Sequence, residues 1–233
     1  LKVGPQLGTY FFGINLDREP FRSKPGLRRA LSLALDRARI TGSVTRVGEL
    51  PAEGWVPPGT FDYTSQQFDY AARPMAERIA EARRLYAEAG YSAANPLRFE
   101  LRYNTGEVNN RIAVAAAAMW KQALGAQVSL AMREFKVLQQ EVDARQVDLF
   151  RGSWIGDYND AYTFLQLFKS DFGINTPHFR DPGYDALLLA AAREVDPAKR
   201  RAKLEEGERL LLAAHPIVPV YFYVNKHLVS PRV

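Results

Sequence analysis

The stretch Leu97-Arg98-Phe99-Glu100-Leu101-Arg102-Tyr103 decides the fold class of this chain of 233 residues. Its apolar residues alternate strictly with charged ones, which is the pattern of a β-strand with one buried face. A helical pattern follows over residues 108–123, and residues 127–132 alternate again. A helix over 135–144 then leads to a third strand at 147–151. The order strand, helix, strand, helix, strand predicts an α/β protein with a mainly parallel sheet and right-handed crossovers.

Three polar segments follow these predicted strands. They are residues 104–109, which end in Asn109, residues 133–135, which end in Phe135, and residues 151–160. Open α/β sheets bind ligands in the crevice beyond the carboxyl ends of their strands. We therefore expect the three segments to line a ligand site.

The third segment, Arg151-Gly152-Ser153-Trp154-Ile155-Gly156-Asp157-Tyr158-Asn159-Asp160, suits one wall of a ligand-binding cleft. A carboxylate at Asp157, flanked by Trp154 and Tyr158, would attract a primary ammonium group. A hydrogen bond to such a charged partner contributes roughly 1.5–3 kcal/mol. Structural alternatives stay open at this point: Asp157 can cap the next helix, Trp154 can pack in the core, and Arg151 can form an internal salt bridge.

An enzyme is the rival hypothesis. Asp157 and Asp160 could serve as the general acid and general base of a hydrolase, as paired carboxylates do in glycosidases. Nothing in the nearby sequence drives their pKa values apart, so no catalytic residue is assigned. The chain lacks a G-x-S-x-G motif, a glycine-rich phosphate loop and an H-E-x-x-H motif. Because His178, His215 and His227 are far apart in the sequence, no metal site and no cofactor is expected.

The composition is that of an ordinary globular protein, with 47% hydrophobic and 24% charged residues. The net charge of +5 comes from basic residues that are mixed with acids and form no stripe, so no nucleic-acid partner is expected. The absence of cysteine excludes disulfides and thiolate metal sites. No apolar run approaches the roughly 20 residues of a membrane helix. The N-terminus has neither an initiator Met nor a signal-peptide pattern, so we expect a processed chain or a fragment.

The rest of the chain predicts further helices and two flanking strands. Residues 49–74 form a long irregular segment whose aromatic side chains are expected to attach it to the body of the protein. Pro219 indicates that the last strand lies at a sheet edge or crosses between lobes. The expected elements are helices at 25–35, 37–44, 75–89, 183–194 and 198–214, a short helix that includes residues 164–168, and strands at 9–16 and 217–224.

Several of these segments together resemble the oligopeptide- and dipeptide-binding proteins of ABC importers, which are the family 5 extracellular solute-binding proteins. The likeness is most specific at Ala30-Leu31-Ser32-Leu33-Ala34-Leu35-Asp36-Arg37 and at Trp154 to Asn159. It includes residues 10–15, 97–105 and 217–221 and spans nearly the whole chain. The greatest likeness is to the oligopeptide-binding branch.

The resemblance implies a type II periplasmic binding protein-like lobe, with a mainly parallel sheet flanked by helices. Residues 1–233 would form the C-terminal ligand-binding lobe of a two-lobed protein, without its N-terminal lobe. Residues 1–20 and 217–233 would be strands beside the hinge. The implied function is non-catalytic capture of a small peptide or another small solute. The implied partners are the membrane permease subunits of an ABC importer, in the periplasm or another extracytoplasmic space, with the binding protein acting as a monomer.

The resemblance also implies roles for individual residues. Asp157 would hold the α-ammonium group of a peptide, and Trp154 would line a side-chain pocket. Arg151 would serve the carboxyl end of the peptide. Phe135 stands where the oligopeptide-binding branch has a tryptophan and would keep an aromatic wall.

Two positions depart from the pattern of that branch. Asn109 replaces a histidine and Val142 replaces an arginine, so recognition of the ligand carboxylate is expected to differ. Relatives bind nickel complexes, sugars, haem or opines, and the ligand class therefore stays open. The expected ligand-binding residues are Asp157, Trp154, Arg151, Phe135, Asn109 and Tyr158.

Overall fold

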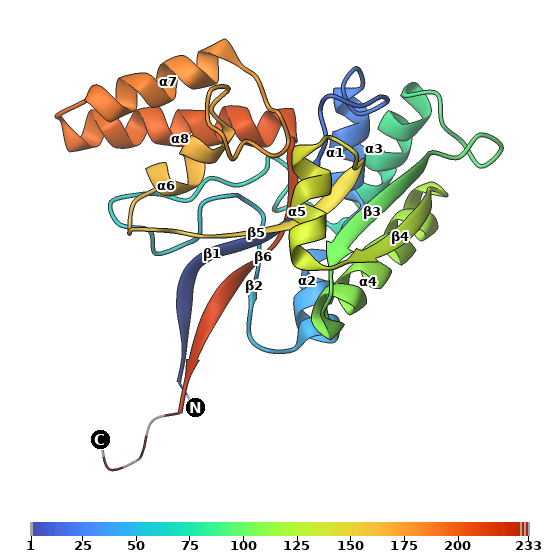
Figure 1. The fold of residues 1–233 in the computed structure, drawn as a ribbon, viewed down its shortest axis with the longest axis horizontal. Helices are drawn as coiled ribbons and strands as arrows, with labels where there is room; N and C mark the ends of the chain where they lie inside the picture. The colour runs from blue at the N-terminus through green and yellow to red at the C-terminus, as the bar shows by residue number, and fades with distance from the viewer. Residues whose placement is uncertain (1, 229, 231, 233) are drawn as a thin grey trace.

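A computed structural model describes residues 2–228, 230 and 232 of the chain. One six-stranded sheet runs through it in the order β2-β6-β1-β5-β3-β4 (Figure 1). Its strands are β1 (Lys2–Ile14), β2 (Leu50–Pro51), β3 (Arg98–Asn104), β4 (Gln127–Arg133), β5 (Leu149–Ile155) and β6 (Ile217–His227). The α-helices are α1 (Pro25–Leu33), α2 (Arg37–Arg39), α3 (Met75–Glu88), α4 (Glu107–Leu124), α5 (Phe135–Asp143), α6 (Tyr162–Leu165), α7 (Pro182–Arg193) and α8 (Pro197–Ala214).

The α/β class is confirmed, but the sheet is mixed and not mainly parallel. Strands β3, β4 and β5 are parallel, as the strand and helix order predicts. Strand β1 is antiparallel to both β5 and β6, and β2 is antiparallel to β6. The prediction was wrong for this half of the sheet because alternation identifies a strand without giving its direction. Direction depends on pairing partners, and those of β1 lie far along the chain.

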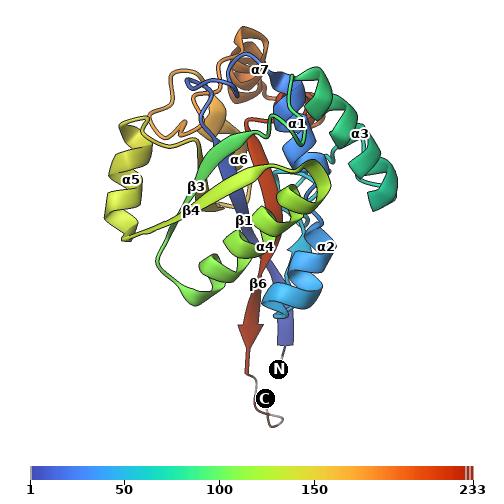
Figure 2. The ribbon, with the colours of Figure 1, turned by 90° about the vertical axis from the view of Figure 1, so that its right-hand side faces the viewer.

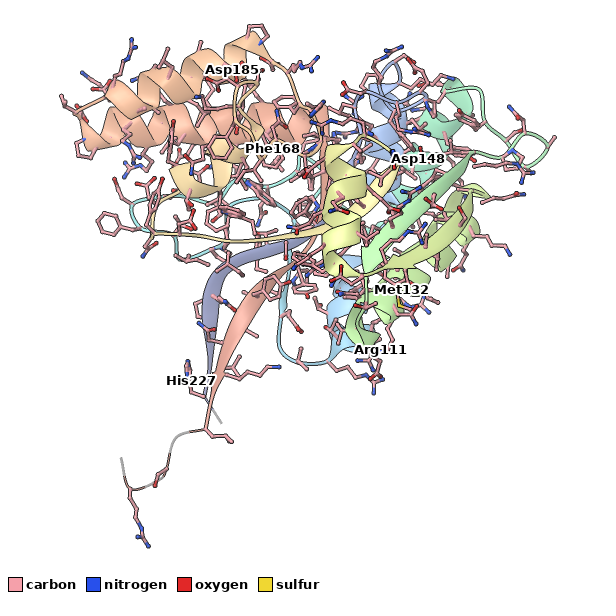
Figure 3. All side chains as sticks on the ribbon, viewed as in Figure 1. Arg111, Met132, Asp148, Phe168, Asp185 and His227 are labelled. Carbon is pink, nitrogen blue, oxygen red and sulfur yellow. The ribbon has the colours of Figure 1, made fainter. Side chains whose placement is uncertain are left out.

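Helices cover both faces of the parallel part of the sheet. The perpendicular view shows α4 on one face of β3 and β4, and α5 on the other (Figure 2). The indole of Trp120 on α4 packs against Phe12 of β1 and Phe99 of β3, with ring centroids 5.8 and 5.6 Å apart. Its Nε1 donates a hydrogen bond of 2.8 Å to the carbonyl oxygen of Leu31 on α1. One buried side chain thus joins two helices to two strands. At the outer edge of the sheet, Met132 on β4 is 54% exposed (Figure 3).

The long helices α7 and α8 begin close to the predicted residues 183 and 198, and side-chain caps explain where they start. Asp181 accepts a hydrogen bond from the backbone N–H of Tyr184, and Asp196 accepts from Ala198 and Lys199, so both aspartates cap helices that start with proline. The helix predicted over residues 37–44 instead divides into α2 and a π-helical turn, η1 (Ile40–Thr45). The predicted segment 164–168 is the end of α6 followed by a 3₁₀ turn, η2 (Gln166–Phe168).

The irregular segment 49–74 is attached to the body of the protein by its aromatic residues, as predicted. Trp55, Phe68 and Tyr70 are buried, whereas Phe61 is 71% exposed. The rings of Phe68 and Tyr70 stack with centroids 4.8 Å apart. The segment has almost no regular secondary structure, so packing and side-chain hydrogen bonds must hold it.

Strands β1 and β6 continue beyond the body of the molecule as a two-stranded ribbon that ends near both termini (Figure 1). Strand β2 pairs with β6 only at Tyr221 and Phe222, so β6 has a single neighbouring strand at Pro219. This agrees with the edge position that the proline predicts. The assignment of 1–20 and 217–233 to a hinge stays a prediction, and residues 1, 229, 231 and 233 lie outside the described residues. Within the described part of the chain, no helix combines the length and apolar character needed to cross a membrane.

Candidate ligand-binding site

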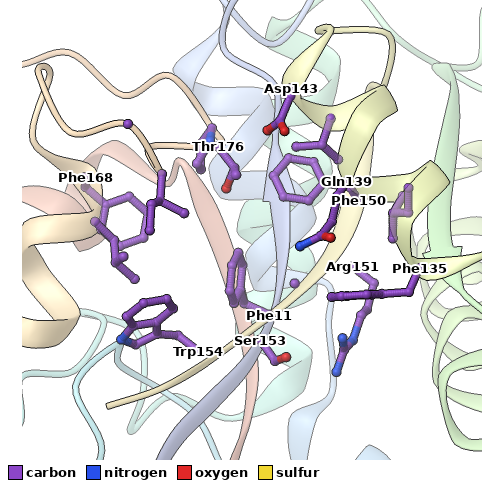
Figure 4. A pocket seen from close by; sticks show the side chains of 17 residues that line it. Phe11, Phe135, Gln139, Asp143, Phe150, Arg151, Ser153, Trp154, Phe168 and Thr176 are labelled. Atoms are coloured by element: carbon purple, nitrogen blue, oxygen red, sulfur yellow. The ribbon is translucent and has the colours of Figure 1, made fainter. Parts of the chain in front are cut away.

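A cavity of about 390 Å³ lies between α5, the middle of β5 and the segment 173–177 (Figure 4). Phe11 of β1 and Phe150 of β5 form its floor, and Leu138 and Val142 of α5 form one side. These four side chains are buried and apolar. The cavity is therefore suited to an apolar group of a ligand.

Two glycines make the floor of the cavity possible. In the β1–β5 register, Phe11 lies opposite Gly152 and Gly13 lies opposite Phe150. Each phenyl ring lies over the glycine of the neighbouring strand. A Cβ atom on Gly152 would be 2.4 Å from Cζ of Phe11, and one on Gly13 would be 2.1 Å from Cζ of Phe150. The absence of side chains at these two positions leaves room for both rings.

Arg151 lines the cavity from β5 and is held by aromatic residues. Its guanidinium lies over the ring of Tyr10, with Cζ 4.7 Å from the ring centroid, and Nη2 donates a 3.1 Å hydrogen bond to Oη of Tyr223. Among the described residues no carboxylate is close enough for an ion pair, and Nε has no hydrogen-bond partner. The internal salt bridge considered for Arg151 is therefore absent from the described part of the chain. This cation has capacity left for an anionic ligand group.

Trp154 and Phe135 stand on different sides of the same cavity (Figure 4). Trp154 is half-buried and packs against the core, so the core-packing alternative is partly correct. Its Nε1 is buried without a hydrogen-bond partner within the described structure. Phe135 is 48% exposed at the start of α5. Both aromatic side chains therefore belong to the lining of the cavity.

Asp157 follows the end of β5, outside the residues that line the cavity. Its carboxylate is exposed, and Oδ2 accepts a 3.3 Å hydrogen bond from Oγ1 of Thr163. No Lys, Arg or His of the described chain forms an ion pair with it. The capping alternative for Asp157 is wrong, because the next helix, α6, has Ala161 as its N-cap and no side-chain capping hydrogen bond. The backbone N–H of Tyr162 donates a 2.7 Å hydrogen bond to Oδ1 of Asp160.

Asp160 is already engaged in a structural ion pair. Its two carboxylate oxygens accept hydrogen bonds of 2.7 and 3.0 Å from Nη1 and Nη2 of Arg200 on α8. The bidentate ion pair occupies both carboxylate oxygens of Asp160 and leaves neither of them directed at a substrate beside Asp157. The hydrolase hypothesis with Asp157 and Asp160 therefore receives no support from the geometry.

The other two predicted residues lie apart from the cavity lining. Tyr158 is 49% exposed beside Asp157. Asn109 lies on α4, and its Nδ2 donates a 3.2 Å hydrogen bond to the carbonyl oxygen of Asn104. The structure thus brings Arg151, Trp154 and Phe135 together around one cavity. It places Asp157 and Tyr158 beyond the strand end and Asn109 on another segment.

Two parts of the cavity are not among the residues predicted for the site. Phe11 lies in a predicted strand that has no predicted role in binding. Phe168 and the segment 173–177 have no predicted connection with the site either. Glycine inside a strand pattern marks a close approach of other groups, so Gly152 was a usable signal for an aromatic neighbour. No local signal places segment 173–177, which reaches the cavity through tertiary packing. Among the described residues no cluster of three His, Cys, Asp or Glu could hold a metal ion.

Comparisons with known proteins agree with this architecture. The family model described as bacterial extracellular solute-binding proteins, family 5 Middle, matches residues 1–176. The periplasmic oligopeptide-binding protein OppA of Escherichia coli (strain K12) is 36% identical over 231 residues, which are 99% of this chain and 42% of that protein. The probable deoxycholate-binding periplasmic protein YgiS of the same strain is 37% identical over 233 residues, which are 100% of this chain and 43% of that protein.

A solved structure extends the agreement to three dimensions. The crystal structure of Haemophilus influenzae OppA in complex with RPPGFSPFR matches with a TM-score of 0.92 at 37% identity. The match covers 98% of this chain and 45% of that one, so this chain spans less than half the length of these relatives. The resemblance found in the sequence is confirmed: the chain belongs to the family 5 bacterial extracellular solute-binding proteins.

Proposed function

We propose that this chain is a ligand-binding lobe that captures peptides outside the cytoplasm for the permease subunits of an ABC importer. One observation carries the proposal. The segment from Arg151 to Asp157 holds a cation at one end and an anion at the other, and neither has an ion-pair partner among the described residues. An apolar cavity lies along the same segment. This arrangement is complementary to a zwitterion with apolar side chains, such as a short peptide.

Each site residue then has a role in holding the peptide. Asp157 accepts hydrogen bonds from the α-ammonium group, and Arg151 donates to a carboxylate of the ligand. Trp154 and Phe135 flank an apolar side chain seated over Phe11. Tyr158 lies beside the ammonium site, and Asn109 can offer its amide to a ligand that extends past β3. The proposed process is non-catalytic.

The lobe arrangement is part of the proposal. Residues 1–233 would form the C-terminal lobe of a two-lobed, monomeric binding protein, and 1–20 and 217–233 would lie beside its hinge. Two observations support this division. The chain matches less than half of each relative described above, and β1 and β6 project together from the body as a ribbon (Figure 2).

A second ligand class is favoured by the apolar lining of the cavity. An amphipathic anion with a large apolar body could place its anionic group on Arg151 and its body over Phe11 and Phe150. Such a ligand would need neither Asp157 nor a free ammonium group. The dependence of binding on Asp157 therefore separates the two candidates.

The test is a calorimetric titration of the chain with the tripeptide Ala-Phe-Ala and, separately, with its N-acetylated form. Loss of a charged hydrogen bond costs roughly 1.5–3 kcal/mol, which corresponds to an affinity loss of roughly 10- to 140-fold. We expect this loss on acetylation of the peptide and in the Asp157→Asn variant. The matched control is Asp69→Asn, which removes a surface partner of Arg29 and should leave the affinity unchanged.

Equal affinity for the free and acetylated peptides would eliminate the ammonium role of Asp157. Deoxycholate serves as the probe for the second candidate. Binding of deoxycholate that is lost in Arg151→Ala and retained in Asp157→Asn would replace the peptide proposal with the amphipathic anion.

A further inference from the structure

Glu208 on α8 has a fully buried carboxylate whose hydrogen bonds all go to one loop. Oε1 accepts from the backbone N–H groups of Trp55 and Val56, both at 2.8 Å. Oε2 accepts from Oη of Tyr63 at 2.6 Å and from the backbone N–H of Gln66 at 3.1 Å. No lysine, arginine or histidine within the described residues forms an ion pair with it. Four donors from segment 54–66 therefore converge on one side chain.

The segment 54–66 is shaped around this carboxylate. It has no helix or strand in which its backbone groups could be paired, and buried N–H groups require an acceptor. A Cβ atom on Gly54 would lie 2.0 Å from the carbonyl oxygen of Gln66. The glycine permits the two ends of the segment to approach each other and face Glu208 together.

One route leads from this segment to the ligand cavity through Trp55. The indole packs edge-on against Phe11 and Phe168, with centroids 5.1 and 5.2 Å away, and both phenyl rings line the cavity. Its Nε1 donates a 2.8 Å hydrogen bond to the carbonyl oxygen of Phe164. Glu208 binds the backbone N–H of Trp55. It therefore positions the indole that packs behind Phe11 and Phe168, two of the residues that line the cavity.

A second route leads to the segment 157–160, which carries Asp157. The backbone N–H of Phe61 donates a 2.8 Å hydrogen bond to Oδ1 of Asn159. Helix α8 also binds the residue that follows each of these partners, because Arg200 pairs with Asp160 and Arg201 pairs with Asp62. Hydrogen bonds and ion pairs thus join the segment 54–66, the segment 157–160 and helix α8.

We propose that Glu208 is a positioning residue for the ligand site: it holds segment 54–66 so that Trp55 supports the cavity wall and Phe61 supports the rim beside Asp157. It lies too deep to touch the ligand. The expected effect on peptide binding rests on the proposed function. The coupling between the segments 54–66 and 157–160 is inferred from their contacts and does not depend on that function.

The test uses two variants that weaken the hydrogen bonds between Glu208 and the segment 54–66, together with one matched control. Tyr63→Phe removes one donor to Glu208 and keeps the ring, while Glu208→Gln keeps the shape of the side chain and removes one acceptor oxygen. The control is Tyr103→Phe, which removes a buried tyrosine hydroxyl that donates a 2.7 Å hydrogen bond to Oδ1 of Asn110, away from the loop. Amide hydrogen exchange is measured for all three variants and for the unmodified chain.

We expect exchange to accelerate at least tenfold in both 54–66 and 157–160 for Tyr63→Phe and Glu208→Gln, and in neither segment for Tyr103→Phe. Acceleration confined to 54–66, with 157–160 unchanged, would overturn the proposal, because the loop would then be held without affecting the site. If Glu208→Gln fails to fold, Tyr63→Phe alone decides.

A binding measurement separates this inference from the proposed function. The same variants are titrated with Ala-Phe-Ala under conditions where they are folded, and Tyr63→Phe is expected to bind at least threefold more weakly than Tyr103→Phe. Equal affinity for both variants would remove the role of Glu208 in binding. If the unmodified chain binds no peptide, the proposed function fails, and hydrogen exchange still decides whether Glu208 positions the rim.

Discussion

At the scale of single residues, the cavity depends on the pairing of Phe11 with Gly152 across two strands. Gly152→Ala would place a methyl group 2.4 Å from the ring of Phe11 and force the ring to move. We expect a loss of about 1–3 kcal/mol in the free energy of unfolding, which is the usual cost of overpacking, and a smaller cavity. Urea denaturation of the variant and of the unmodified chain measures the loss in the free energy of unfolding.

The matched control for this substitution is Gly173→Ala at the cavity rim. Apart from its two chain neighbours, none of the described residues has a heavy atom within 4 Å of a Cβ built on Gly173. The effect of Gly173→Ala should therefore stay within about 0.5 kcal/mol. Similar losses in the two variants would show that the ring of Phe11 is not tightly packed over Gly152.

At the scale of elements, helix α8 carries the buried carboxyl group of Glu208, and its C-terminal cap is the buried imidazole residue His215. Burial shifts the pKa values of these two groups in opposite directions. Burial raises the pKa of Glu208 from 4.5 to about 7 and lowers the pKa of His215 from 6.5 to about 4. The imidazole of His215 stacks on Phe68, and Arg28, Arg29 and Arg37 add to the depression of its pKa. Between pH 4.5 and 7 the folded state binds more protons at Glu208 than the unfolded state does. Its contribution to stability is therefore full below pH 4.5 and falls as the pH rises to about 7.

The contribution of His215 changes in the opposite sense, since between pH 4 and 6.5 the unfolded state binds more protons at this residue. We predict that Glu208→Gln removes the loss of folding stability that Glu208 causes as the pH rises, and leaves the contribution of His215 in place. From pH 4.5 to 7 the stability of the variant should rise relative to the unmodified chain by up to about 3 kcal/mol. Denaturation at four pH values in this range gives the difference directly. His215→Asn should show the opposite slope, and a difference independent of pH in either variant would contradict its pKa shift.

The elements also show how far the sequence could predict the fold and the site. Local sequence patterns predicted the parallel strands β3, β4 and β5 and the helices α7 and α8, because each pattern lies within the element that it predicts. The antiparallel half of the sheet and the floor of the cavity depend on which distant strands pair. Arg151, Trp154 and Phe135 were predicted as site residues from their positions after strands, and the structure places them around one cavity. Phe11 reaches it through a register that no local pattern specifies.

At the scale of the whole molecule, the described chain offers one face to a ligand. The cavity opens beside exposed side chains such as Phe135 and Ile174, which are 48% and 51% accessible. Binding sites usually bury most of the ligand surface. In the proposed two-lobed arrangement, one lobe alone would leave the far side of a peptide in water, and the other lobe would supply much of the contact area.

The affinity of the 233-residue chain for peptides should accordingly be modest. We predict a dissociation constant weaker than 1 µM for RPPGFSPFR, so that the binding free energy is less favourable than about −8.2 kcal/mol. Calorimetry with the chain measures the constant, and light scattering in the same buffer measures its mass. Binding tighter than 1 µM to a monomer would contradict the two-lobed proposal, because one lobe would then suffice. Binding of that strength to a dimer would instead indicate that a second copy covers the exposed face, and Phe135→Ser, at the rim of that face, should then weaken both the dimer and the complex.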